Sequence, residues 1–327
     1  MPGKKQVRMA FCDLAPDWDA RDNYFTQALE HAGWEITFCN GPEEKPDFVL
    51  CGTFGFDFLK YDCCRIQFSG EDSWPDLNLY DYAMGFEVLD FDGRYLRLPL
   101  YAMRSSWAPA LTKHTVPDEE LLAKKKFCNF VVSNDYSNER NEFFAALNAH
   151  RPVDSGGGYM NNIGGPVTDK LAFQRGYKFS IAYENSRGRG YCTEKIVDAF
   201  AAATVPIYWG APDVKQEFNP AAFLCADDYP DTAALIAAID EIDRDDEKFL
   251  AMCHAPILAP DGSSRAARYV TDEACAEFLT GIFEKGPHLR RNRSCWGSIY
   301  EGDWKYYRRL AEADQKPKGL LQRILGR

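Results

Sequence analysis

Short apolar runs alternate with helix-periodic segments along this chain, and that alternation constrains the fold more than any other feature. In the first half, strand-like runs occupy residues 7–12, 34–39, 47–51 and 65–68, and residues 22–31 have the apolar spacing of a helix. Strands that alternate with helices favour a mostly parallel sheet with crossover helices. We therefore expect an α/β fold.

A second series of the same kind follows residues 99–126, where the pattern weakens. Because the chain has 327 residues, we predict two Rossmann-like domains facing a cleft, at residues 1–123 and 124–300. A basic C-terminal helix or tail is expected at residues 301–327, packing back on the first domain. A ligand is expected in the cleft, beyond the C-terminal strand ends. The second series comprises predicted strands at residues 127–132, 178–183 and 205–208 and predicted helices at residues 138–149, 168–174, 193–203, 231–242 and 272–283.

The charge balance limits the partners of the chain. Lysine and arginine total 38 against 49 aspartate and glutamate residues, a net charge of −11. Nucleic-acid binding requires a basic surface, so we expect no nucleic-acid partner. The charge is uneven, because residues 285–327 carry eleven basic and four acidic side chains, a net charge of +7 that leaves −18 for the rest.

The lack of a recognisable targeting signal and the spacing of the cysteines predict a cytoplasmic protein. The first residues, MPGKKQVRMAFCDL, contain no apolar run of signal-peptide length, and no stretch approaches the roughly 18–20 apolar residues of a membrane span. The 11 cysteines include no CxxC pair, so neither a zinc ribbon nor a thioredoxin-like site is indicated. Reduced thiols in a cytoplasm are the ordinary interpretation of such a pattern.

The segment YKFSIAYENSRGRGYCTEKIVDAFAAATVPIYWGAPDV, residues 177–214, carries the clearest chemistry. It is predicted to form a strand, a glycine-containing loop, a helix and a second strand. Thr193 can cap the helix, whose first turn then offers backbone N–H groups and a partial positive charge. Lys195 adds a full positive charge there, and Glu194 is an acceptor suited to ribose hydroxyls. This arrangement fits a nucleotide diphosphate.

The same pattern has an ordinary alternative. Many α/β proteins have a strand, a loop and a helix without a phosphate site, and Glu194 with Lys195 can be a surface pair that suits the helix dipole. The loop lacks the third glycine of GxGxxG, and GK[ST] is absent. These absences weaken the dehydrogenase and ATPase interpretations.

The segment resembles the signature region of the α-1,3-fucosyltransferases of glycosyltransferase family 10. The resemblance rests on YEN at residues 183–185, YCTEK at 191–195 and VPIYWGAP at 205–212, in that order. Upstream, residues 68–101 resemble the acceptor-side block of bacterial members, and residues 133–148 resemble the block that opens their second domain. The resemblance implies a GT-B fold, with the donor nucleotide on the C-terminal domain.

The reaction that the resemblance implies is inverting transfer of L-fucose from GDP-β-L-fucose to the N-acetylglucosamine of N-acetyllactosamine-type glycans, the Lewis x precursors. Such a transfer needs a carboxylate to take the acceptor proton and cations to stabilise the departing GDP. The resemblance implies Glu71 as the base, and Asp72 is the competing carboxylate. Attack at position 3 or 4 of the acceptor sugar stays open.

The donor residues are also implied by the resemblance. Arg140 and Lys195 are expected to contact the diphosphate, and Glu194 the ribose hydroxyls. Without the resemblance, Arg140 would be interpreted as a helix-surface charge. Tyr208 and Trp209 could line a sugar pocket, although aromatic residues that end a strand more often belong to a core. The remaining donor-site residues that we expect are Glu184, Asn185 and Tyr191.

Some features depart from the family pattern or leave a question open. Arg187 and Arg189 add positive charge to the loop, and Cys192 stands where a β-branched residue is usual. Because Cys192 is close to the proposed nucleotide site, thiol modification is expected to block activity. No metal ligand is expected, because the five histidines show no HxxH, HxxxH or HExxH spacing. No cofactor is required on this interpretation, and stimulation by a divalent cation stays open.

Two competing functions stay open. The chain could be a transferase for another nucleotide sugar, or a non-catalytic carbohydrate-binding protein on the same scaffold.

The last residues of the chain, KPKGLLQRILGR at 316–327, mix apolar and basic side chains. A basic amphipathic tail is attracted to anionic lipid, so peripheral contact with the inner face of a bacterial inner membrane is expected. The alternative is a solvated helix end.

Overall fold

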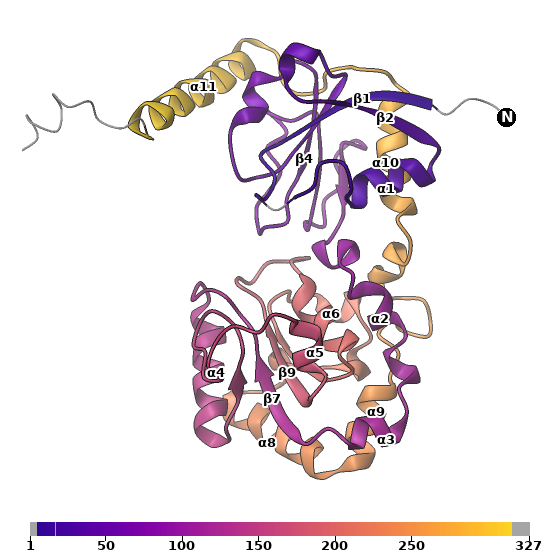
Figure 1. Cartoon of the computed structure of the whole chain (residues 1–327), viewed down its shortest axis with the longest axis vertical. Helices are drawn as coiled ribbons and strands as arrows, with labels where there is room; N and C mark the ends of the chain where they lie inside the picture. The colour runs from indigo at the N-terminus through magenta and orange to yellow at the C-terminus, as the bar shows by residue number, and fades with distance from the viewer. Residues whose placement is uncertain (1–4, 17, 316–327) are drawn as a thin grey trace, which may run out of the picture. The chain divides into compact units, whose positions relative to one another are not determined.

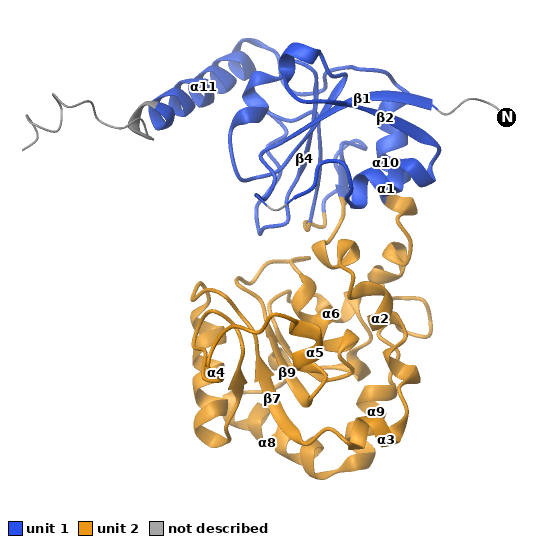
Figure 2. Cartoon of the chain, viewed as in Figure 1, with its two compact units in different colours: residues 1–85, 89–96, 275–327 blue, residues 86–88, 97–274 orange. Residues whose placement is uncertain are grey.

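The computed structural model describes residues 5–16 and 18–315, which form two compact units (Figure 1). Unit 1 comprises residues 1–85, 89–96 and 275–327, and unit 2 comprises residues 86–88 and 97–274 (Figure 2). Each unit contains its own parallel sheet with helices. The predicted α/β class with two parallel sheets is confirmed.

Compactness divides the chain differently from the sequence pattern. The sequence pattern predicts a boundary between residues 123 and 124, whereas residues 97–123 belong to unit 2. The pattern also predicts that residues 275–300 belong to the second domain, whereas they belong to unit 1. Unit 1 is therefore built from both ends of the chain.

Unit 1 contains a six-stranded sheet in the order β2-β1-β3-β4-β5-β6. The pairings from β2 through β5 are parallel. Every residue of β3 and β4 is buried, as expected for parallel strands covered on both faces. The elements that lie wholly or mostly in this unit are β1 (Lys5–Cys12), α1 (Tyr24–His31), β2 (Trp34–Cys39), β3 (Phe48–Cys51), β4 (Cys64–Phe68), β5 (Tyr82–Gly85), β6 (Tyr95–Arg97), α10 (Glu273–Phe283) and α11 (Cys295–Gln315).

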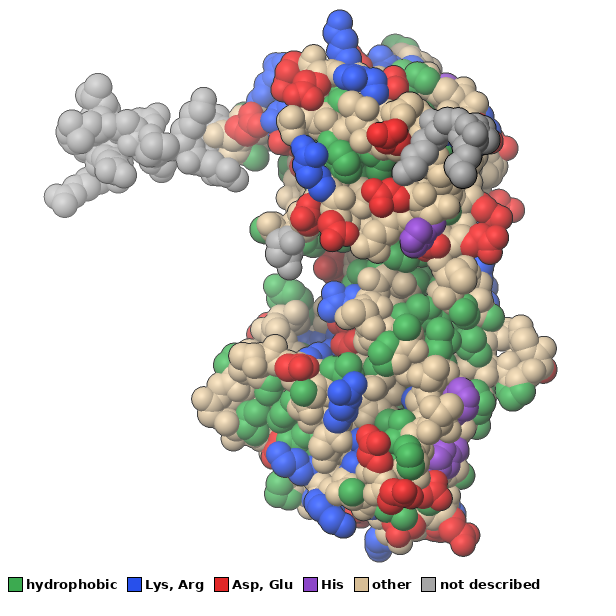
Figure 3. Space-filling model, turned by 45° about the vertical axis from the view of Figure 1, so that its right-hand side comes forward, with side chains coloured by type: hydrophobic (Ala, Val, Ile, Leu, Met, Phe, Trp, Pro, Cys, Tyr) green, Lys and Arg blue, Asp and Glu red, His purple; other side chains and the backbone are tan. Residues whose placement is uncertain are grey.

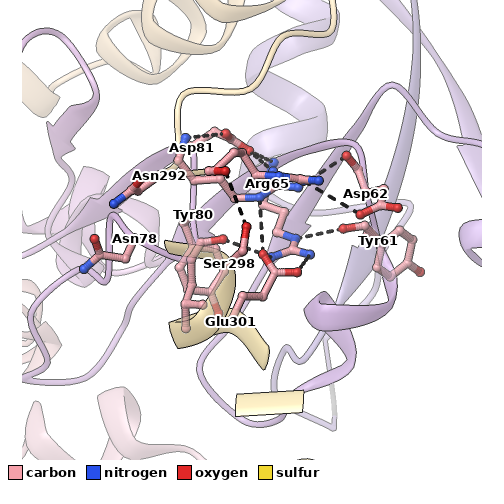
Figure 4. A network of polar contacts seen from close by, with 12 residues as sticks. Tyr61, Asp62, Arg65, Asn78, Tyr80, Asp81, Asn292, Ser298 and Glu301 are labelled. Carbon is pink, nitrogen blue, oxygen red and sulfur yellow. Dashed lines mark hydrogen bonds and ion pairs between the residues drawn. The ribbon is translucent and has the colours of Figure 1, made fainter. Parts of the chain in front are cut away.

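A buried network of charges ties the C-terminal segment to the sheet of unit 1 (Figure 4). Arg65 of β4 pairs with Glu301 of α11 at 3.2 Å, and its backbone N–H donates to Asp81 at 2.8 Å. Arg291 also pairs with Asp81. Burial opposes the charge on Glu301, but Lys305 and Arg65 outweigh it and lower the pKa of that carboxyl to about 2. Two arginines and two carboxylates thus compensate one another away from water.

Unit 2 contains a five-stranded parallel sheet in the order β11-β10-β9-β7-β8. Apolar side chains of α4, α8 and α9 pack with those of β7 and β9 in one core cluster. Helix α6 buries a separate apolar face that contains Ile196 and Phe200. The elements of this unit are α2 (Trp107–Leu111), α3 (Asp118–Leu122), β7 (Lys126–Phe130), α4 (Asn138–His150), β8 (Asp154–Ser155), α5 (Lys170–Gln174), β9 (Tyr177–Tyr183), α6 (Glu194–Ala201), β10 (Val205–Trp209), α7 (Val214–Glu217), β11 (Leu224–Cys225), α8 (Thr232–Arg244) and α9 (Asp246–His254).

Acidic and basic side chains interleave on the face that Figure 3 shows. Helix α11 exposes several large apolar or aromatic side chains, of which Trp296 is 78% exposed. Within residues 5–16 and 18–315, no helix combines the length and the apolar character needed to cross a bilayer. The tail at residues 316–327 lies outside the described residues.

Candidate functional site

The candidate site lies in unit 2, where β9 and β10 end beside the start of α6. Strand β9 ends at Tyr183, and the backbone N–H of Glu184 continues the pairing by donating to Trp209 O at 2.9 Å. Glu184 and Asn185 therefore stand at the carboxyl edge of the sheet, where parallel α/β folds place ligands. Residues 186–193, here called the β9–α6 loop, lead from this edge to α6.

Glu184 organises the start of α6. Its carboxylate is fully buried and accepts hydrogen bonds from Thr193 N at 2.7 Å, Thr193 Oγ1 at 2.6 Å and Lys195 Nζ at 3.0 Å. Glu184 is predicted from the sequence to line the donor site. In the structure its side chain holds Thr193 and Lys195 in position, and its part in donor binding stays a prediction.

Thr193 does not cap α6 in the expected way. It occupies the N-cap position, but no side-chain cap hydrogen bond forms there. Its hydroxyl donates to the Glu184 carboxylate instead, because a buried carboxylate is a stronger acceptor than any neutral partner within reach. The first turn of α6 thus keeps its backbone N–H groups clear of a capping side chain, a geometry that suits an anion.

Lys195 and Glu194 carry the charges at this helix start. Their side chains are 13% and 21% exposed, so both reach the surface of the site. Burial opposes the charge on Lys195, but the carboxylates of Glu184 and Glu194 outweigh it and raise the pKa of Lys195. Burial likewise opposes the charge on Glu194, but Lys195 and Lys170 lower the pKa of that carboxyl to about 2. Both groups are therefore charged at neutral pH.

Arg140, in the first turn of α4, is brought to the same edge. It is 1% exposed, and its guanidinium donates to Asn185 Oδ1 and, at 2.7 and 2.9 Å, to the carbonyl and side-chain oxygens of Asn134. Its buried Nε has no hydrogen-bond partner among the described residues. The structure thus brings Arg140 and Asn185 together at this edge of the sheet, and the Nε of Arg140 lies buried without a protein acceptor.

The β9–α6 loop contains two buried residues that the sequence singled out. Tyr191 is 2% exposed and packs edge-on against Phe86, with ring centroids 4.9 Å apart. Cys192 is also buried, and burial raises the pKa of its thiol well above the usual value. A protonated thiol that solvent does not reach is a poor target for alkylation. Cys192 therefore offers no accessible thiolate to the reagents that we expected to affect the site.

The loop arginines have different surroundings. Arg187 pairs with Asp227 at 2.9 Å, and Arg189 stays largely exposed, 3.7 Å from Asp213. A cavity of about 270 Å³ opens beside the first pair, with Trp209 and Tyr183 among its lining residues. Tyr208 is instead fully buried and belongs to the core. The remaining residues that line the cavity are Glu139, Glu142, Phe143, Ala226, Asp227, Tyr229, Asp231, Thr232 and Leu235.

Glu71 belongs to unit 1, three residues after the end of β4. Its backbone oxygen accepts from Ser69 Oγ at 2.9 Å and from Ser73 N at 2.8 Å, which fixes the turn that carries it. Its side chain and that of the competing Asp72 are exposed. The role of Glu71 as the base stays a prediction.

Across residues 5–16 and 18–315, no three His, Cys, Asp or Glu side chains converge in a group that could hold a metal ion. Among the described residues, Arg140 and Lys195 both act on Glu184, and Lys170 and Arg104 lie close enough to act on Glu194.

Two protein-family models match the chain. One describes the α-(1,3)-fucosyltransferase FucT N-terminal domain and matches residues 9–104. The other describes the C-terminal part of glycosyltransferase family 10 (fucosyltransferase) and matches residues 121–254. The second model covers Arg140 and every residue of the β9–α6 loop.

Individual proteins agree with these matches. The α-(1,3)-fucosyltransferase FucT of Helicobacter pylori is 34% identical over 286 residues, which are 77% of this chain and 60% of that protein. A crystal structure of an α1,3-fucosyltransferase with GDP-fucose superimposes with a TM-score of 0.74 at 29% identity, covering 87% of this chain and 92% of that one. The chain thus spans about 60% of the length of the Helicobacter relative.

A more distant likeness concerns the fold alone. The structure of Anabaena HepE in complex with UDP superimposes with a TM-score of 0.51 at 8% identity, covering 85% of this chain and all of that one. Together with the fucosyltransferase structure, it agrees with the predicted GT-B architecture of two Rossmann-like domains.

Proposed function

The chain belongs to glycosyltransferase family 10, the fucosyltransferases, and on this premise we propose that it is an inverting α-1,3-fucosyltransferase. Its donor is GDP-β-L-fucose, and its acceptor is the N-acetylglucosamine of N-acetyllactosamine-type glycans. The observation that carries the proposal is the charge arrangement at the start of α6. There, buried Glu184 holds Lys195 at 3.0 Å beside an uncapped helix start, within the segment that matches the family.

The donor half of the reaction uses unit 2. Lys195, the first turn of α6 and Arg140 bind the diphosphate and stabilise the negative charge that GDP carries as it leaves. Glu194, ionised because its pKa is about 2, accepts hydrogen bonds from the ribose hydroxyls. Tyr191 and Asn185 complete the walls of this site. Their roles follow from the family and from their place at the end of β9.

The acceptor half needs a base, and we assign this role to Glu71. The acceptor hydroxyl oxygen bonds to the anomeric carbon of fucose on the face opposite GDP, and the bond from that carbon to the phosphate oxygen breaks. The hydroxyl proton passes to the Glu71 carboxylate, and GDP leaves with the electron pair of the broken bond. This displacement inverts the anomeric centre from β to α.

We also propose that turnover needs no bound metal ion. The proposal is supported by Lys195, Arg140 and the uncapped start of α6, which together can supply the charge stabilisation that a metal gives elsewhere. Initial rates in EDTA should therefore equal those in buffer alone. A rate that EDTA abolishes and Mn²⁺ restores would contradict this part of the proposal.

Peripheral contact with anionic lipid on the cytoplasmic side of the membrane is the proposed setting. It is supported by the basic residues of the tail at 316–327 and by exposed aromatic side chains of α11, such as Trp296 and Tyr307. The full chain should sediment with phosphatidylglycerol vesicles more than a chain ending at residue 315 does. Equal sedimentation of the two forms would leave the tail as a solvated end.

The test of function compares nucleotides and carboxylates in one assay. GDP should inhibit transfer from GDP-fucose to N-acetyllactosamine at far lower concentrations than UDP or ADP do. Glu71→Gln should abolish transfer and keep GDP binding, whereas the neighbouring Asp72→Asn should retain activity. Full activity in Glu71→Gln would refute the base assignment. GDP binding without transfer to any acceptor of a type 1 and type 2 panel would favour the non-catalytic alternative.

A further inference from the structure

An arginine at the end of β6, whose side chain is 9% exposed, holds the β9–α6 loop through a backbone carbonyl. We propose that Arg97, which belongs to unit 2, is a positioning residue for this loop and thereby for the nucleotide contacts of α6. Its Nη2 donates to Gly190 O at 3.0 Å, and its Nε donates to Phe86 O at 3.0 Å. The identity of the nucleotide rests on the proposed function, whereas the contacts do not.

Gly190 is the point at which the loop is held. Arg97 binds its carbonyl oxygen, and its N–H donates to Asp213 Oδ1 at 2.9 Å. Asp213 is fixed in turn by Arg265 Nη2 at 2.8 Å. The backbone of Gly190 has a φ of +81°, and a Cβ at this position would lie 2.4 Å from Phe86 O. Both peptide groups and the space around Gly190 are therefore specified by other segments.

Glu217 compensates the charge of the largely enclosed Arg97 side chain. Its carboxylate is 1% exposed and accepts from Arg97 Nη1 at 3.0 Å, and it also bonds Tyr101. Burial opposes the charge on Arg97, but Glu217 outweighs it and raises the pKa of the guanidinium. Arg97 thus uses three different nitrogens for three partners. A lysine has one nitrogen and cannot reproduce this planar fork.

The loop connects Arg97 to the nucleotide contacts by a short path. Gly190 O accepts from Cys192 N at 2.9 Å as well as from Arg97. The next residue, Thr193, is bound through its N–H and its hydroxyl to Glu184, which also holds Lys195. A shift of the Gly190 carbonyl must therefore strain the segment that leads directly to Thr193. Arg97 acts on this path through the Gly190 carbonyl, and its other contacts are with Phe86, Glu217 and the ring of Tyr269.

The matched control for Arg97 is Arg94. It is buried, at 8% exposed, and its guanidinium donates to backbone oxygens of unit 1, those of Leu77, Tyr80 and Asp81, and contacts no described residue of the β9–α6 loop. Arg97→Lys and Arg94→Lys should both lower the stability of the full-length protein. Only Arg97→Lys should loosen the β9–α6 loop, which faster hydrogen exchange of its amides would show.

The experiment measures GDP affinity by calorimetry, the KM values for donor and acceptor, and hydrogen exchange of the amides at residues 188–193. Arg97→Lys should weaken GDP binding and raise the donor KM by about tenfold or more, the effect of losing one hydrogen bond of a charged group. Its loop amides should exchange faster, and its acceptor KM should stay within about twofold of wild type. Arg94→Lys should match wild type in all four values.

The results for the two variants distinguish failure of this inference from failure of the proposed function. Wild-type affinity and wild-type loop exchange in Arg97→Lys would overturn the inference, as would equal losses in Arg94→Lys. If wild type itself did not bind GDP, the proposed function would fail, while faster loop exchange confined to Arg97→Lys would still support the positioning role. If Arg97→Lys does not fold, Glu217→Gln replaces it, because this change keeps an oxygen for Arg97 and weakens its hold in the same direction.

Discussion

The pair formed by Lys195 and Glu184 allows stability and nucleotide binding to be separated by mutation. Lys195 Nζ lies 3.0 Å from Glu184 Oε2, and the two side chains are 13% and 0% exposed. Lys195→Met leaves a buried carboxylate without its cation, which typically costs about 3–5 kcal/mol. Glu184→Gln in the same chain removes that uncompensated charge, and the amide oxygen can still accept from Thr193 N.

The expected result is a rescue of stability without a rescue of binding. Urea unfolding should show that Lys195→Met loses about 3–5 kcal/mol. The unfolding free energy of the double variant should return to within about 1 kcal/mol of wild type, because one hydrogen bond at this position is still missing. GDP affinity, measured by calorimetry, should fall about tenfold or more in both chains, because a charge-assisted bond to phosphate is lost in both.

Either of two outcomes would refute this reasoning. Wild-type GDP affinity in a folded Lys195→Met protein would show that Lys195 does not bind the diphosphate. Recovery of GDP affinity in the double variant would show that Lys195 serves only to neutralise Glu184. Lys195→Arg is the matched control, since it keeps the charge and should retain most of the affinity.

Three further predictions concern other parts of the molecule. The pKa of Glu301 falls from 4.5 in the unfolded chain to about 2, which corresponds to about 3 kcal/mol of stability that is present above pH 4.5 and lost as the pH falls towards 2. Glu301→Gln should therefore be less stable at pH 7, because Arg65 loses its partner, and should lose that part of the pH dependence. The unfolding free energy of each protein is measured by urea titration at several pH values. An equal dependence of this free energy on pH in the two proteins would contradict the prediction. Gly190→Ala should lose GDP affinity, whereas Gly33→Ala, with a similar φ of +82° and no atom within 4 Å of the new Cβ, should keep it. Equal GDP affinity in both variants would contradict the steric argument. Mass spectrometry after iodoacetamide treatment should find Cys192 unmodified until denaturant is added, and rapid native labelling would contradict its burial.

The elements with a regular apolar pattern could be predicted from the sequence. Strand β9 and helix α6 were expected at residues 178–183 and 193–203, and they are found at Tyr177–Tyr183 and Glu194–Ala201. Both bury a continuous apolar face, which leaves a periodic signal in the sequence. The expected charged residues Glu184, Glu194 and Lys195 meet at one helix start because they flank a single strand–loop–helix segment.

The missed elements are short or held by distant contacts. Strand β5 (Tyr82–Gly85) has four residues in a stretch where aspartate and glycine recur, so no run of strand length stands out. Helix α11 begins at Cys295, before the expected tail, and Glu301 on it pairs with an arginine 236 residues earlier. Arg97 was missed for the same reason, since Gly190 and Glu217 lie 93 and 120 residues away in the sequence. Such contacts leave no local pattern.

The most direct test of the central claim follows both products of one reaction. The full-length protein is incubated with GDP-β-L-fucose and N-acetyllactosamine, GDP is quantified, and the glycan is examined by NMR. We predict one GDP for each trisaccharide formed, with fucose in the α configuration at O3 of N-acetylglucosamine. GDP released without a fucosylated glycan, or a product with the β configuration, would contradict the claim that this chain is an inverting α-1,3-fucosyltransferase.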